Sequence, residues 1–152
     1  MPEPASPLLC PNVAILSGSD RLIQFRPGAQ KDILDIQIEA DISKLAFACQ
    51  FYDNHVRVNT SFQIKAHLGL KSKVDKVSVP FFVAIINPKG DIIAKKVFKS
   101  VLSFPKKHRN AVIQEKVTQQ VPLSNPSLAS KYQVLVGFQL TSAQLEFNEA
   151  RY

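Results

Sequence analysis

The chain has 152 residues, of which 45% are hydrophobic and 20% are charged, so it can bury a core and lacks the composition of a disordered protein. No apolar run approaches the roughly 18 residues that a membrane-spanning helix needs. Nineteen Lys and Arg against twelve Asp and Glu give a formal net charge of +7, which favours encounters with anionic partners.

The N-terminal segment, residues 1–9, is predicted to be a flexible, Pro-rich leader, because Pro2, Pro4 and Pro7 favour extended backbone. It has neither the basic nor the apolar region of a signal peptide, so read literally the chain is cytoplasmic. If Met1 stands in place of a removed signal peptide, the chain is an exported protein. Residues 10–141 are predicted to form the folded domain, and residues 142–152 a short helical segment.

Alternation of apolar and polar residues is the dominant pattern along the chain. Residues 34–42 and 55–68 are apolar at every second position, which predicts strands with one buried and one solvent-facing side. Shorter strands are predicted at residues 13–16, 22–26, 45–52, 77–86, 92–98 and 132–140. Residues 111–121 fit either a strand or a helix, and we interpret them as a strand.

Turn and cap residues separate these segments. Asp53-Asn54 predicts a hairpin turn, and Pro88 with Gly90 predicts a chain reversal at residues 87–91. Pro80 indicates either the start of a strand or an edge strand. Thr141 and Gln144 have the spacing of a capping box, which predicts a helical turn after them.

Short strands with almost no helix predict an all-β fold, an antiparallel β-sandwich of about seven to nine strands. An immunoglobulin-like or fibronectin-III-like Greek key with a short C-terminal helical turn is the expected arrangement. A small barrel is the alternative.

The two cysteines, Cys10 and Cys49, allow two interpretations. If they pair, the closed loop of about 40 residues stabilises the fold by roughly 4 kcal/mol and implies an oxidising compartment. Otherwise Cys49 is an ordinary buried residue and Cys10 is a free thiol.

Basic residues gather in three clusters beside predicted turns. Such clusters are typical of solvated loops and of edge strands protected from aggregation, or they form a contact surface for an anionic partner. Nucleic acid is disfavoured, because no aromatic residues are interleaved with the basic ones. The candidate contact residues are Lys71, Lys73 and Lys76, then Lys95, Lys96 and Lys99, and finally Lys106, Lys107 and Arg109, with His108 beside them.

Motifs for catalysis are missing from the sequence: it has no Gly-x-Ser-x-Gly elbow, no phosphate-binding loop and no His-Glu-x-x-His. His55 and His67 lie on one predicted strand about 40 Å apart, too far to share a metal. We therefore predict no catalytic, cofactor-binding or metal-binding residues, and a protein that is not an enzyme.

Three segments together resemble a group of small exported proteins of alphaproteobacteria that are often labelled lipoproteins and have no established function. The segments are CPNVAIL at 10–16, LIQFRPG at 22–28 and YQVLVGFQLT at 132–141. The resemblance implies that a signal peptide has been removed and that the protein is periplasmic or envelope-associated. It also implies that Cys10 is either paired with Cys49 or lipidated.

The expected function is a non-enzymatic structural or protein-interaction module of the cell envelope. Such a module would dock another envelope protein through its basic loops or through a free sheet edge. The alternative is a binding module for an anionic ligand, such as nucleic acid or an acidic polymer, through its lysine-rich loops.

Overall fold

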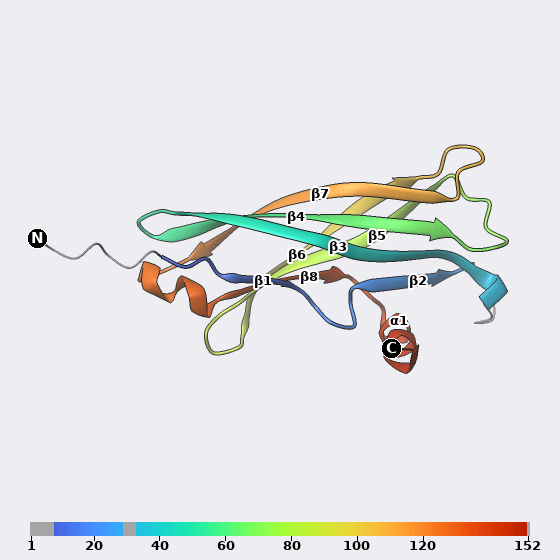
Figure 1. Ribbon diagram of the computed structural model, residues 1–152. Coiled ribbons are helices and arrows are strands. Elements are labelled where there is room, and N and C mark those ends of the chain that lie inside the picture. The colour runs from blue at the N-terminus through green and yellow to red at the C-terminus, as the bar shows by residue number, and fades with distance from the viewer. Residues whose placement is uncertain (1–7, 29–32, 152) are drawn as a thin grey trace, which may run out of the picture.

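The structure, a computed structural model, describes residues 8–28 and 33–151, and in this part of the chain two four-stranded sheets pack face to face (Figure 1). The predicted leader, residues 1–9, lies outside the described residues except for its last two. Sheet A contains β1 (Asn12–Ile15), β8 (Gln133–Phe138), β5 (Lys76–Ile86) and β6 (Ile92–Ser103), in that order. Sheet B contains β2 (Arg21–Phe25), β3 (Ile36–Phe51), β4 (His55–Leu68) and β7 (Asn110–Pro122). The other elements are η1 (Ile33–Asp35), η2 (Pro126–Lys131) and α1 (Ser142–Arg151).

This architecture confirms the all-β sandwich and the short C-terminal helix, and the described strands fall within the predicted number. Strands β2, β3 and β4 are consecutive neighbours in one sheet, so the strand order differs from that of immunoglobulin constant domains. All neighbouring strands are antiparallel except β1 and β8, which pair in parallel, with Asn12 opposite Gln133. The ambiguous segment at residues 111–121 is a strand, as predicted, and forms most of β7.

Strand β3 corrects one prediction, because residues 34–42 and 45–52 were expected to form two strands and instead belong to one. A bulge between Ser43 and Ala46 lets the strand continue, and Lys44 takes a left-handed conformation there with φ of 55°. Because the bulged strand has one extra residue, side chains at even positions point inward before the bulge and those at odd positions point inward after it. Ile42 is therefore buried before the bulge, and Cys49 packs against the core after it.

The core fills the space between the sheets, because alternate residues of β3 and β4 point inward. Phe62 of sheet B is fully buried and meets Phe81 of sheet A edge to face, with ring centroids 5.2 Å apart. Phe81 in turn stacks on Phe98 of β6 at 5.1 Å. Aromatic pairs of this kind add to the stabilisation from burial, so this chain of rings holds the sheets together.

Pro80 lies in the middle of β5, a central strand, and not at a strand start or on an edge strand as predicted. The ladder between β5 and β8 begins only at Phe81, so the missing N–H of Pro80 interrupts no pairing with β8. The carbonyl of Pro80 accepts a hydrogen bond from Gln139 N at 2.9 Å, just where β8 ends.

The predicted turns and cap are confirmed. The Asn87 side chain accepts hydrogen bonds from Lys89 N and Asp91 N, which stabilises the β5–β6 turn. Thr141 and Gln144 form the reciprocal capping box, with bonds of 2.9 and 3.1 Å. Helix α1 lies against β2, where Asn148 donates to the carbonyls of Gly18 and Arg21 at 3.1 and 2.7 Å.

Candidate docking surfaces

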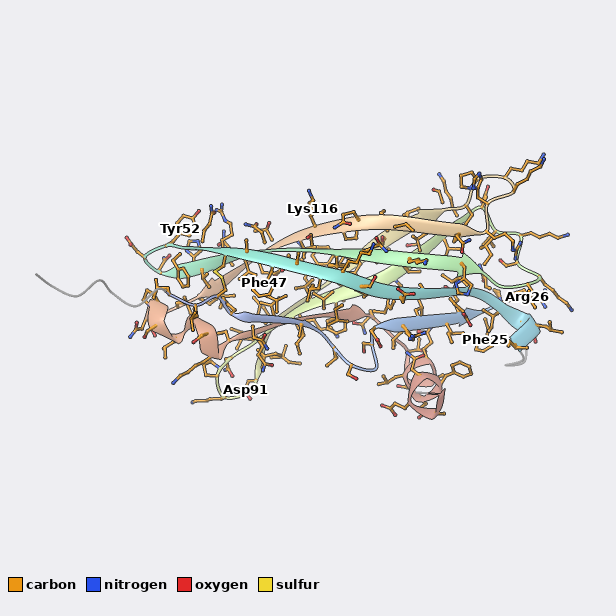
Figure 2. The ribbon with its side chains drawn as sticks, viewed as in Figure 1. Phe25, Arg26, Phe47, Tyr52, Asp91 and Lys116 are labelled. Carbon is orange, nitrogen blue, oxygen red and sulfur yellow. A yellow bond between two sulfur atoms is a disulfide. The ribbon has the colours of Figure 1, made fainter. Side chains whose placement is uncertain are left out.

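A disulfide joins Cys10, just before β1 in sheet A, to Cys49 of β3 in sheet B, with Cα atoms 5.8 Å apart. The pairing alternative of the sequence analysis is therefore confirmed. Both sulfurs are used in this bond, so in this form Cys10 has no thiol to accept a lipid. The bond lies near the end of the sandwich that carries Tyr52, opposite the end that carries Arg26 (Figure 2).

The first and third basic clusters meet at the Arg26 end of the sandwich, where the β4–β5 and β6–β7 connections lie together (Figure 1). We call this surface the basic end. It surrounds a hollow of about 610 Å³ whose floor includes the apolar side chains of Leu68, Val74 and Phe104. One carboxylate, that of Asp75, also lines it. The basic residues that line the hollow are Lys73, Lys76, Lys106, Lys107, His108 and Arg109, with Lys71 in the same connection as Lys73.

Arg109 holds the two connections together. Its guanidinium donates to the carbonyl of Gly69 and, at 3.5 Å, to that of Ser72, while its own carbonyl accepts from Leu68 N at 2.9 Å. A further bond from Phe104 N to Asp75 O measures 2.7 Å. Arg109 therefore supports the basic end, and its side chain is also exposed there, so the contact role stays a prediction.

Gly69 is a residue of the basic end that the sequence analysis missed. A Cβ at this position would overlap the carbonyl oxygen of Ile36, because Gly69 packs directly against the β3 backbone and donates its N–H to Gln37 O at 2.9 Å. The available signal was a glycine directly after a long alternating strand, which often marks a close backbone approach.

Replacing Gly69 by alanine is expected to lower the free energy of unfolding by about 1–3 kcal/mol, because the clash is with backbone and cannot be relieved by a rotamer change. Urea unfolding measures the loss. Leu70→Ala is the matched control, because Leu70 is 76% exposed and its truncation should change stability by less than about 0.5 kcal/mol. Equal stability of Gly69→Ala and the native chain would contradict the packing described here.

The second basic cluster does not lie in a loop, because Lys95, Lys96 and Lys99 are all within β6. Lys95 Nζ lies 4.9 Å from the ring centroid of Phe82, and Lys96 Nζ lies 5.1 Å from that of Phe98. The two lysines therefore lie on opposite faces of sheet A. This cluster is a property of a sheet edge, separate from the basic end.

Two histidines and two acids in or next to sheet B have ordinary partners. His67 Nε2 lies 2.8 Å from Glu39 Oε2 on the outer face of sheet B, and His55 stacks on Tyr52. Asp35 pairs with Arg26 at 2.7 Å. Within residues 8–28 and 33–151, no three His, Cys, Asp or Glu side chains are grouped so that they could hold a metal ion.

In the same part of the chain, no helix has the length and apolar character that crossing a bilayer requires. Comparisons with protein-family models, with curated proteins and with solved structures find no match to this chain.

Proposed function

We propose that this chain is a non-enzymatic docking module of the cell envelope, and that its basic end binds an acidic segment or surface of another envelope protein. The observation that carries this proposal is the meeting of two distant lysine clusters around one hollow. A surface of one charge sign steers and selects a partner of the opposite sign. The disulfide supports the envelope location, since such bonds persist mainly outside the reducing cytosol.

The basic end is also preorganised for binding. Hydrogen bonds from Arg109, Gly69 and Phe104 fix the backbone of both connections before any partner arrives. Lys107 is held at φ of 71°, in the left-handed region that costs a non-glycine residue about 1–2 kcal/mol. A fixed backbone reduces the entropy that a partner's binding must overcome.

An acidic protein is favoured over nucleic acid as the partner, although both are anionic. Proteins that bind single strands stack bases on exposed aromatic rings. The phenylalanine that lines the hollow, Phe104, is only 3% exposed and offers no such surface. Capture of an acidic polymer or nucleic acid through the same lysines remains the competing function for the experiment to distinguish.

The test compares two variants with the same loss of charge. The first replaces Lys73, Lys76, Lys106 and Lys107 by glutamine, and the second replaces Lys44, Lys65, Lys116 and Lys131, which are exposed elsewhere. Figure 2 shows that Lys116, for example, points away from the sandwich. We expect the first variant to bind a polyglutamate peptide roughly 30-fold more weakly than the native chain, taking about 0.5 kcal/mol for each exposed ion pair.

The second variant should keep most of the native affinity, as measured by titration calorimetry at low salt. Equal weakening of both variants would mean that net charge alone drives binding, which contradicts a defined docking surface. Tighter binding of duplex DNA than of polyglutamate, lost in the first variant only, would favour the anionic-ligand alternative.

A further inference from the structure

The free edge of β6 is a second surface, which the proposed function does not use. Strand β6 is the last strand of sheet A and pairs with β5 alone among the described residues. Its first six residues, 92–97, are exposed on both faces of the sheet, whereas Ala84 and Ile85 of the neighbouring strand are buried. This part of β6 therefore extends beyond the cover of sheet B with its outer edge open.

The exposed part of β6 is unusually apolar for an edge. Ile92 is 64% exposed, Val97 is 49% exposed and Val101 further along is 51% exposed. Charges, prolines or bulges protect an edge strand from aggregation. Exposed β-branched side chains do not protect it. Such residues are favoured where a neighbouring strand packs against them.

The charges of sheet A are all of one sign. Its four strands contain no Asp or Glu, and β6 carries Lys95, Lys96 and Lys99. Lys95 and Lys99 each lie two residues from Val97, so all three side chains point to the outer face of the sheet. Lys96 lies on the inner face with Phe98. Lysines on an edge oppose pairing with a second copy, because like charges opposite each other are destabilising.

The other edge on this side of the sandwich, β7, has a different character. Its inward-facing Glu115 accepts a hydrogen bond from Ser100 of β6 at 2.9 Å. An inward-pointing charge is one of the devices that block strand addition. Of the β6 and β7 edges, the part of β6 that precedes Ser100 is therefore the one that is apolar and cationic.

We propose that the free edge of β6 accepts an extended acidic segment of another protein as a fifth strand of sheet A. Main-chain hydrogen bonds would supply affinity, and alternate side chains specificity. In an antiparallel arrangement, two carboxylates four residues apart face Lys95 and Lys99, and a β-branched residue between them faces Val97. The recognised pattern is therefore Glu-x-Val-x-Glu or its aspartate equivalent. A partner segment without the two carboxylates does not match this pattern.

The probe is the synthetic peptide Thr-Glu-Thr-Val-Thr-Glu-Thr with blocked ends, added to the full chain. We expect slower amide hydrogen exchange along β6, measured by NMR. Two further peptides are N-methylated, one at its odd-numbered and one at its even-numbered residues. One of them should lose binding and the other should keep it, because only every second amide of an added strand faces the edge. A surface that merely attracts negative charge would not distinguish the two methylated peptides.

Charge reversal at the edge provides the second measurement. Lys95→Glu with Lys99→Glu should weaken peptide binding at least about tenfold, because two attractive cross-strand pairs become repulsive. Lys65→Glu with Lys116→Glu, on the outer face of sheet B, is the control with the same charge change and should leave binding nearly unchanged. The variant lacking the four lysines of the basic end should also bind the peptide, which separates this proposal from the proposed function.

Several results would overturn the proposal. Protection confined to residues 69–76 and 104–109 would mean that the peptide binds the basic end instead. Equal affinity for both methylated peptides would exclude strand addition. A dimer that forms at high salt with protected β6 amides, detected by sedimentation, would make a second copy of the chain the occupant of this edge.

Discussion

Replacing both Cys10 and Cys49 by alanine is expected to lower the free energy of unfolding by about 4 kcal/mol, because the bond closes a long loop in the unfolded chain. The sequence separation of the two cysteines is 39 residues. In a domain of this size the loss corresponds to a fall in Tm of roughly 10–15 °C. Thermal unfolding of the double variant measures the change, and the native chain under reducing conditions should show the same fall.

The same bond gives a test of the proposed location. Protein recovered from its native host should have two thiols that are unreactive until reduced, and intact mass with and without alkylation measures this. Two reactive thiols in untreated protein would contradict the envelope location, because the bond would then not form where the protein works. An unchanged Tm in the double variant would instead contradict the stabilising role of the disulfide.

Truncating Phe62 to alanine is the other large effect, with an expected loss of about 3–5 kcal/mol. Phe62 is fully buried and its ring meets Phe81 across the sheet interface, so its removal leaves a cavity between the sheets. Urea unfolding with an unchanged slope measures this loss. Phe47→Ala is the control, because Phe47 is 44% exposed and should lose about 1 kcal/mol or less. Similar losses for the two variants would contradict the central position of Phe62.

The sequence predicted those features of the fold that depend on near neighbours. The period-two pattern at residues 55–68 matches β4 exactly in its bounds, because side-chain alternation is a local property of strands. The bulge in β3 also has a local signal, since apolar residues occupy even positions up to Ile42 and odd positions from Leu45 onward. That change of phase could have indicated one bulged strand in place of two.

Features that depend on distant partners could not be read from the sequence. Nothing near Lys73 or Lys107 indicates that their connections meet, because the meeting follows from the pairing of β4 with β7 and of β5 with β6. The supporting role of Arg109 depends on carbonyls of Gly69 and Ser72, about 40 residues earlier in the chain, which no local pattern identifies.

The parallel pairing of β1 with β8 has a consequence for how the chain folds. Asn12 pairs with Gln133, so β1 finds its neighbour only in a strand that follows β2 to β7 along the chain. Until then β1 has no ladder partner, and sheet A lacks the strand that joins β1 to β5. Contacts between distant residues slow folding, because a long loop must close first. Sheet A therefore stays incomplete until β8 is available to pair with both β1 and β5.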